Sequence, residues 1–344
     1  MKKNQDDQAL PEKKIRSGCK KTTIGGQALI EGLMMIGPAK KAMAVRKSDG
    51  SIAIEEMPIT RFTGAASLLF VRGSVRLFRQ LVSGTQALLK SAEFAEEAAD
   101  ISAEDTSPAD AAVKSADSEK QPGWLDRFLE KHKNLALYLS AILGILFSVG
   151  LFILLPNLIT SLISQFTGLQ TRQNIGGTIL INLVEGAIRI ALFVGYLALA
   201  SRMKDIRRVW MYHGAEHKSI ACYEDSQELT VDNARQYSRF HPRCGTAFMF
   251  IVIIVSIIVF SFVGWWDRWL NLLIRFALVP LVAGIAYEII RLAGRYDNWL
   301  TRAISAPGLW LQRLTTAEPD DSMLEVALVA LQAVLPEKQQ NDNW

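Results

Sequence analysis

The sequence has few cysteines and two long stretches without a single charged side chain. Three cysteines in 344 residues cannot form the disulfide framework of a secreted domain. Residues 134–171 and 244–266 contain no Asp, Glu, Lys or Arg. A helix needs about 20 mostly apolar residues to cross a bilayer, and both stretches are long enough. Together with 50% hydrophobic residues and a mean hydropathy of +0.17, they exclude a purely soluble enzyme.

The charged residues are unevenly distributed. Residues 93–123 carry nine acidic and two basic side chains, a net charge of −7. The whole chain has a formal net charge of +4, so the rest of the chain carries +11. The Ala, Ser, Asp and Glu of this segment predict a disordered acidic linker. Residues 1–22 are rich in Lys and Arg and have no apolar run, which predicts a disordered basic N-terminus and not a cleaved signal peptide. The basic remainder suits an anionic membrane surface, and the absence of a nucleic-acid motif argues against nucleic acid as a partner.

Residues 23–92 predict a small β unit followed by a helix. Residues 42–47 and 51–55 alternate apolar and polar side chains around Asp49-Gly50, a dipeptide typical of tight hairpin turns. Residues 27–35 could add a third strand. Residues 68–91 read as an amphipathic helix with basic residues, which suits either the membrane interface or the core of a small soluble domain.

Residues 124–290 predict a membrane domain of about four transmembrane helices, at about 135–155, 177–200, 244–264 and 269–290. Pro156 makes residues 157–171 either a kinked continuation of the first span or a segment on the outer surface. The loop 201–243 has eight basic residues, whereas the two loops on the opposite side have only Arg172 and Arg268. Positively charged loops remain in the cytoplasm, so we expect this loop and both termini there. Residues 291–336 then form a cytoplasmic helical segment, with Asp320 and Asp321 able to cap a helix.

Three of the four histidines lie in the cytoplasmic loop. His213, Glu216 and His217 form an H-x-x-E-H motif, and His241 and Cys244 follow as H-x-x-C. On a helix, residues four apart lie on the same face, so His213 and His217 can bind one ion. Two imidazoles with one or two further ligands suit a divalent metal, and zinc is the ion we expect. His241 or Cys244 would complete the shell, and Glu216 would handle a proton, as in inverted zinc-protease motifs.

Simpler interpretations exist for these residues. The histidines share the apolar side of a predicted helix, as buried structural histidines do. Four protein ligands would make a structural site, whereas three ligands and a water would make a catalytic one. Cys222 is expected to be a packed side chain. Glu185 and Arg189, four apart in the second span, suggest an intrahelical ion pair, although charges at that depth are also functional candidates. Arg275 and Glu288 lie near the ends of the fourth span and are expected to extend toward the membrane surface.

Four blocks in order, residues 25–38, 213–218, 241–246 and 306–316, resemble the YqhQ-like family. The likeness runs from about residue 23 to residue 335, with the acidic linker as the variable part. The resemblance implies a bacterial multi-pass protein of the cell membrane, with a suspected metal site at His213, Glu216, His217, His241 and Cys244. It implies no particular reaction or substrate.

The sequence therefore predicts a mainly α, polytopic membrane protein with a small N-terminal cytoplasmic unit that contains a β-hairpin. The first functional hypothesis is a zinc-dependent, hydrolase-like enzyme with its metal site on the cytoplasmic face: His213, His217 and one of His241 or Cys244 bind the ion, and Glu216 activates water. The alternative is a non-enzymatic assembly or scaffold factor with a structural metal site. A transporter would depend on Glu185 and Arg189 alone. The lipid bilayer is the expected partner.

Overall fold

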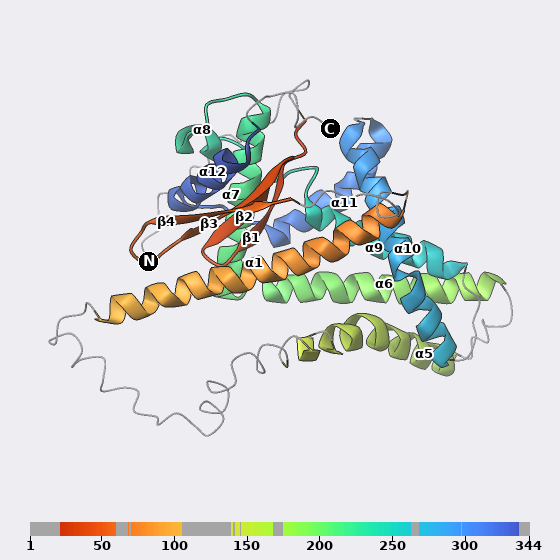
Figure 1. Ribbon diagram of the computed structural model, residues 1–344. Helices are drawn as coiled ribbons and strands as arrows, with labels where there is room; N and C mark the ends of the chain where they lie inside the picture. Colours follow the sequence, from red (N-terminus) through yellow and green to blue (C-terminus); the bar gives the residue numbers. More distant parts are fainter. Residues whose placement is uncertain are drawn as a thin grey trace, which may run out of the picture. The chain divides into compact units, whose positions relative to one another are not determined.

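The computed structural model describes residues 21–59, 68, 70–104, 139, 142–144, 146–167, 175–262, 268–296 and 298–336. The protein is mainly helical, with a four-stranded antiparallel sheet near the N-terminus (Figure 1). Its contacts divide the chain into two units. The first comprises residues 1–98, 197–259 and 267–344, and the second comprises residues 99–196 and 260–266. Most of the predicted basic N-terminus lies outside the described residues.

The sheet in the first unit has the strand order β1-β2-β3-β4. Its strands are β1 (Gly25–Leu29), β2 (Gly32–Ile36), β3 (Lys40–Arg46) and β4 (Ile52–Pro58). The predicted hairpin is β3–β4, and Gly50 has the positive φ of 82° that its turn requires. The stretch proposed as one further strand, residues 27–35, forms parts of two strands. The chain turns at Glu31, which has a φ of 52°, and Gly32 then lets the backbone pass β3 closely.

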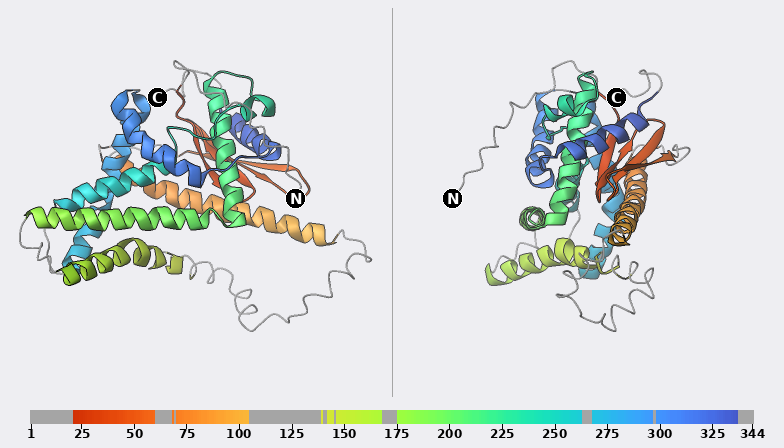
Figure 2. Two further views of the ribbon diagram at one scale, coloured as in Figure 1. Left: turned by 180° about the vertical axis from the view of Figure 1, so that it is seen from behind. Right: turned by 90° about the vertical axis from the view of Figure 1, so that its left-hand side faces the viewer.

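The sheet is the middle of three layers because its side chains alternate between two buried faces. Leu29, Met34, Met43 and Val45 form one cluster with Ala87 of helix α1 (Val71–Glu104). The opposite face packs against α7 (Lys204–Glu224) and α12 (Asp321–Val334), through Leu33, Met35, Ala42 and Ala44 (Figure 2). Asp320 caps α12 by accepting the N–H of Met323 at 2.9 Å, as the sequence predicted. The core that supports α7 therefore uses strands and a helix from opposite ends of the chain.

Helix α1 is longer than the sequence predicted. It continues to Glu104, so residues 93–104, which were expected to begin the acidic linker, are helical. Ala and Glu are strong helix formers, and a composition argument for disorder overlooks that preference. Residues 105–123 lie outside the described residues. One side of α1 packs on the sheet through Ala87, while Phe78 and Leu81 on its surface are exposed.

The first turns of α1 contact helix α10 (Arg268–Arg295) in the same unit. Arg72 donates to both carboxylate oxygens of Glu288 at 2.6 Å. Gly284 approaches so closely that a Cβ there would lie 2.2 Å from the Phe70 carbonyl oxygen. Glu288, expected to extend toward the membrane surface, is thus held by an arginine from another helix.

Among the described residues, three helices are long and apolar enough to cross a membrane: Ile142–Phe166, Ile179–Ala200 and Leu273–Arg295. The first joins a π-helical segment, η2 (Gly150–Leu154), to α5 (Leu155–Thr167), so the helix continues through Pro156. The second lies in α6 (Ile175–Ala200) and the third in α10. The remaining predicted span corresponds to α9 (Gly245–Ser261), a shorter apolar helix of 17 residues. The described chain thus supports three of the four expected spans by length and composition.

The second unit contains the predicted Glu185–Arg189 ion pair. Arg189 Nη2 lies 2.8 Å from Glu185 Oε1, one turn earlier on α6. Arg189 Nε also donates to the Phe152 carbonyl oxygen at 3.0 Å, and Phe152 lies within the π-helical segment η2. The pair therefore has a structural role in joining two apolar helices.

Candidate metal centre

The H-x-x-E-H motif lies on α7 as the sequence predicted. His213 and His217 are one helical turn apart, and their ring centroids are 4.4 Å apart. Both side chains are buried, with exposed fractions of 8% and 1%. The helix packs against the sheet and α12 beside this face, so the two imidazoles lie in the interior of the first unit.

Cys244 joins the two histidines from the segment that precedes α9. Its Sγ lies 3.2 Å from His213 Nε2. One ligand atom from each of His213, His217 and Cys244 can be chosen so that all three lie within 4.8 Å of one another. Nitrogen and sulfur ligands at this spacing form a group that can bind a metal ion such as Zn²⁺. Three of the four predicted ligands therefore come together.

The other ring nitrogen of each histidine is fixed by a backbone carbonyl. His213 Nδ1 lies 2.7 Å from the Thr315 oxygen, and His217 Nδ1 lies 2.5 Å from the Arg239 oxygen. A carbonyl can only accept, so Nδ1 carries the proton in both rings, and in the neutral rings Nε2 has a lone pair available. His217 Nε2 is buried and has no hydrogen-bond partner among the described residues. Metal-binding histidines usually have this second hydrogen bond, so the residues present fit a metal ion.

His241 is placed differently from the other predicted ligands. Its Nε2 lies 3.3 Å from Oε2 of Glu224, a buried carboxylate at the end of α7. The same carboxylate accepts hydrogen bonds from the Arg243 guanidinium and, at 2.9 Å, from the Thr22 N–H. Burial alone would raise the pKa of Glu224, but His241, Arg243 and the Thr22 N–H together lower it. His241 thus belongs to a neighbouring ion-pair cluster in this structure.

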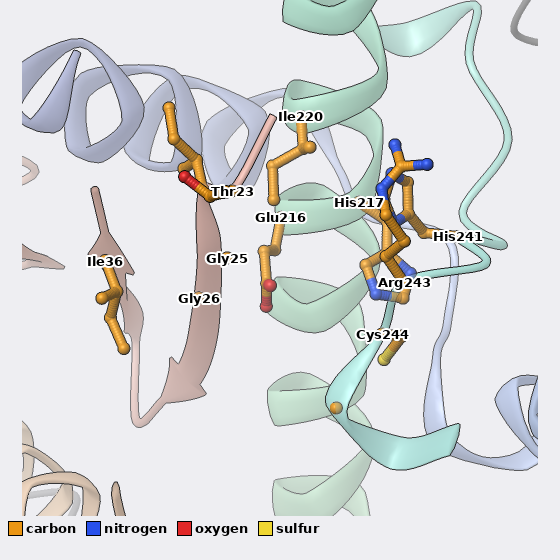
Figure 3. Close-up of a pocket in the computed structure, with 12 residues that line it drawn as sticks. Thr23, Gly25, Gly26, Ile36, Glu216, His217, Ile220, His241, Arg243 and Cys244 are labelled. Atoms are coloured by element: carbon orange, nitrogen blue, oxygen red, sulfur yellow. The ribbon is translucent and has the colours of Figure 1, made fainter. Parts of the chain in front are cut away.

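Glu216 lies on α7 between the two histidines but faces strand β1. Figure 3 shows its carboxylate directed toward the strand that carries Gly26. The Gly26 N–H bonds to this carboxylate. A Cβ on Gly26 would lie 2.9 Å from Glu216 Cδ and 2.9 Å from the Met34 oxygen, so glycine is needed there. Burial raises the pKa of Glu216, although His213 and His217 oppose it. The carboxyl is therefore better able to accept a proton near neutral pH than an exposed glutamate is.

The three grouped residues perturb one another electrostatically. Burial disfavours the charged ring of His213, but Cys244, Glu216 and the Thr315 carbonyl together outweigh burial and raise the His213 pKa to about 9. Burial would likewise raise the pKa of the Cys244 thiol, yet His213 and His217 hold it well below its usual range. The arrangement thus favours a thiolate, the form in which cysteine binds a metal.

A cavity of about 260 Å³ borders the group. It lies between β1, α7 and the segment before α9, and its lining residues are drawn in Figure 3. Glu216, His217 and Cys244 line it, as do Arg243 and Gly25. A Cβ on Gly25 would meet nothing within 4 Å. The cavity gives the three-residue group an adjoining space that a closed structural site does not need.

Sequence reasoning missed several residues that position the group. Gln312 of α11 (Trp299–Thr315) is fully buried, accepts the His241 N–H at 2.8 Å and donates to the His241 oxygen at 2.8 Å. Thr315 of the same helix supplies the carbonyl for His213. Both lie in the block 306–316 that carried the family resemblance, which was the available signal. Gly26 lies in the first block of the resemblance, 25–38. Glu224 lies in none of the four blocks, so nothing in the sequence pointed to it.

Comparison with known proteins assigns the family. A family model described as "Protein of unknown function (DUF1385)" matches residues 68–337. The chain belongs to the DUF1385 family. It is also similar to the "Uncharacterized protein YqhQ" of Bacillus subtilis (strain 168), with 33% identity over 319 residues that cover 90% of this chain and 92% of the relative. The expected YqhQ-like relationship is confirmed, and no solved structure matches the chain. The DUF1385 description carries no activity, so function must be argued from the site.

Proposed function

We propose that this DUF1385 protein is a membrane-bound, zinc-dependent enzyme of the hydrolase type, with its metal site on the cytoplasmic face. The observation that carries the proposal is the orientation of the two imidazoles. Each donates Nδ1–H to a backbone carbonyl, so Nε2 is the ring nitrogen at which an ion would replace a proton, beside a thiol whose pKa is lowered. The buried and unpartnered His217 Nε2 supports a ligand at this point.

The proposed roles divide between two sets of residues. His213, His217 and Cys244 would hold the ion, and a zinc ion held there would supply a Lewis acid that lowers the pKa of a water molecule. Glu216 lines the adjoining cavity and would accept the proton, because burial raises its pKa. Gly26 orients the Glu216 carboxylate, and Gln312 holds the segment that carries Cys244. Three protein ligands beside a cavity favour a catalytic over a structural site.

The membrane location is supported by the three candidate spans and by the loop charges. Large apolar side chains on these helices are exposed, among them Phe147, Leu183 and Phe276. The Lys and Arg residues of loop 201–243 would place the metal site and both termini in the cytoplasm. Alkaline phosphatase fused after residue 225 should be inactive, and phosphatase activity there would place the site on the outer side.

A second candidate function is a non-enzymatic assembly or scaffold factor. It is favoured by the burial of all three grouped residues and by the way the group joins α7 to the segment before α9. In that case the ion would stabilise the fold, and His241 could turn from Glu224 to become a fourth ligand. The predicted division of the chain into an acidic linker at 93–123, of which 93–104 are helical, and a membrane domain at 124–290 is compatible with either function.

Glu216→Gln separates the two functions. We expect the purified variant to retain about one zinc per chain, since Glu216 is not in the three-residue group, and to fail to complement a deletion strain at normal protein level. The amide has nearly the same shape but is a poor base. Full complementation would remove Glu216 as the base and favour the scaffold function. Absence of zinc from the wild-type protein, measured by elemental analysis, would overturn both versions of the metal site.

A further inference from the structure

One face of helix α11 contacts residues of the candidate metal centre. Gly308, Gln312 and Thr315, spaced four and three residues apart, lie on this buried face. Gly308 packs against the start of α9, where a Cβ would lie 2.3 Å from Ala247 Cβ. Gln312 makes its two bonds to His241, and Thr315 accepts from His213. One helix face thus contacts three of the elements that form the site.

The opposite face of α11 is exposed and has an unusual composition. Trp299 is 79% exposed and Trp310 is 50% exposed. Trp299, Ala303, Ala306, Trp310 and Arg313 recur at steps of four, three, four and three, so they form one continuous stripe, and all five are exposed. Tryptophan and arginine on one side of an amphipathic helix are typical of the membrane interface.

The position of α11 in the chain indicates what covers this stripe. The candidate span Leu273–Arg295 ends four residues before Trp299. Four residues extend at most about 14 Å, so α11 begins within the thickness of a headgroup layer from the end of that span. Asn298 ends the connection with a capping box to Thr301, which starts α11 as a separate helix. The exposed Arg313 would complement anionic lipid headgroups.

We propose that α11 lies in the headgroup layer of an anionic bilayer and binds it through Trp299, Trp310 and Arg313. The inference rests on the proposed membrane location but not on zinc binding. An α-helix with its side chains is about 10 Å across, so the metal centre on the opposite face lies about that far from the lipid surface.

Photocrosslinking in the full-length protein tests this contact. p-Benzoylphenylalanine replaces Trp299 or Trp310, and the protein is reconstituted in nanodiscs containing phosphatidylglycerol. Two control positions are Ile54 of β4, which is 52% exposed, and Phe276 of the candidate span, which is 72% exposed. We expect lipid adducts, identified by mass, at positions 299, 310 and 276 and none at position 54.

Arg313→Glu should lower the adduct yield at position 310 by about fivefold in anionic nanodiscs, which corresponds to about 1 kcal/mol, and should have little effect in phosphatidylcholine alone.

The outcomes separate this inference from the proposed function. Adducts at position 276 without adducts at 299 and 310 would overturn the lipid contact of α11 alone. Adducts between two copies of the chain at position 310 would show instead that the stripe is a protein interface. Absence of lipid adducts at every position would overturn the membrane location as well. Lipid adducts at 299 and 310 in a protein that contains no zinc would leave the lipid contact standing and overturn the metal site.

Discussion

His213 and Thr315 are 102 residues apart in the chain, and His213 Nδ1 lies 2.7 Å from the Thr315 carbonyl oxygen. This contact fixes the tautomer of a buried imidazole, because the carbonyl can only accept a hydrogen bond and Nδ1 must therefore carry the hydrogen. The same arrangement recurs at His217, whose Nδ1 faces the Arg239 carbonyl oxygen. The backbone of two separate segments thereby determines which nitrogen of each histidine is available to a metal.

The first prediction concerns which residues bind the ion. His213→Ala, His217→Ala and Cys244→Ala should each lower zinc affinity by at least about a hundredfold, because each removes a ligand atom from the group. His241→Ala should retain the metal, since the His241 ring bonds to Glu224. Zinc is measured by elemental analysis after dialysis against a series of chelators of increasing zinc affinity. Cys222→Ala is the matched cysteine control, and zinc loss in His241→Ala equal to that in Cys244→Ala would establish a four-residue site.

The second prediction concerns the contact between β1 and Glu216. Gly26→Ala should displace the Glu216 carboxylate, because the new Cβ would lie 2.9 Å from both Glu216 Cδ and the rigid Met34 oxygen. We expect a loss of about 1–3 kcal/mol in the free energy of unfolding and loss of complementation with zinc retained. Gly25→Ala, one residue away in open space, should behave as wild type. Equal behaviour of the two variants would show that the Gly26–Glu216 contact has no functional role.

The third prediction concerns Gln312. Gln312→Met keeps the side-chain volume but leaves the buried His241 N–H and carbonyl without their partners. We expect the free energy of unfolding to fall by about 2–4 kcal/mol. Zinc affinity should fall as well, because the segment 239–245 supplies both the Arg239 carbonyl and Cys244. The exposed Gln227→Met is the control for the substitution itself, and unchanged zinc affinity in Gln312→Met would show that the segment is held by other contacts.

The fourth prediction concerns pH and Glu224. Its pKa in the folded protein is lowered below 4.5, so the ionised carboxylate stabilises the fold above about pH 4.5, and this contribution is lost as the pH falls through the folded-state pKa. Glu224→Gln should lower the free energy of unfolding by about 3–5 kcal/mol at pH 7, because the Arg243 side chain, only 13% exposed, would lose its charged partner.

Thermal unfolding between pH 3 and pH 7 measures this effect, with chelator present in every sample so that metal release does not contribute. The difference between wild type and Glu224→Gln should narrow as the pH falls below about 4.5. Glu325→Gln removes the exposed partner of Arg46 and should change stability by less than about 1 kcal/mol at any pH. A difference for Glu224→Gln that is constant with pH would mean that the ionisation of Glu224 does not stabilise the fold.

The sequence predicted the parts of this site that depend on local periodicity. The spacing of His213 and His217 on one helix needs only the helical repeat, and the hairpin around Gly50 needs only turn chemistry. Local periodicity does not predict that His241 pairs with Glu224 and not with a metal ion, because tertiary packing brings these two residues together. Thr315 lies in the block 306–316, but nothing in the sequence indicates that its carbonyl, or that of Arg239, orients a histidine, because every residue has a carbonyl and only the fold selects one. Residues 93–104 are helical although their acidic composition predicts disorder, because Ala and Glu are also strong helix formers.

The dispersed origin of the site has a consequence for biosynthesis. Gly26 and Thr22 come from the first described residues, the histidines from the middle, and Gln312 and Thr315 from near the end. A ribosome releases the chain from its N-terminus, so the carbonyl that orients His213 is absent until almost the entire protein has been made. An ion captured earlier would meet an imidazole free to rotate. Completion of the metal centre should therefore be a late event, after the candidate spans have been synthesised, and chains truncated before residue 312 should accumulate without metal.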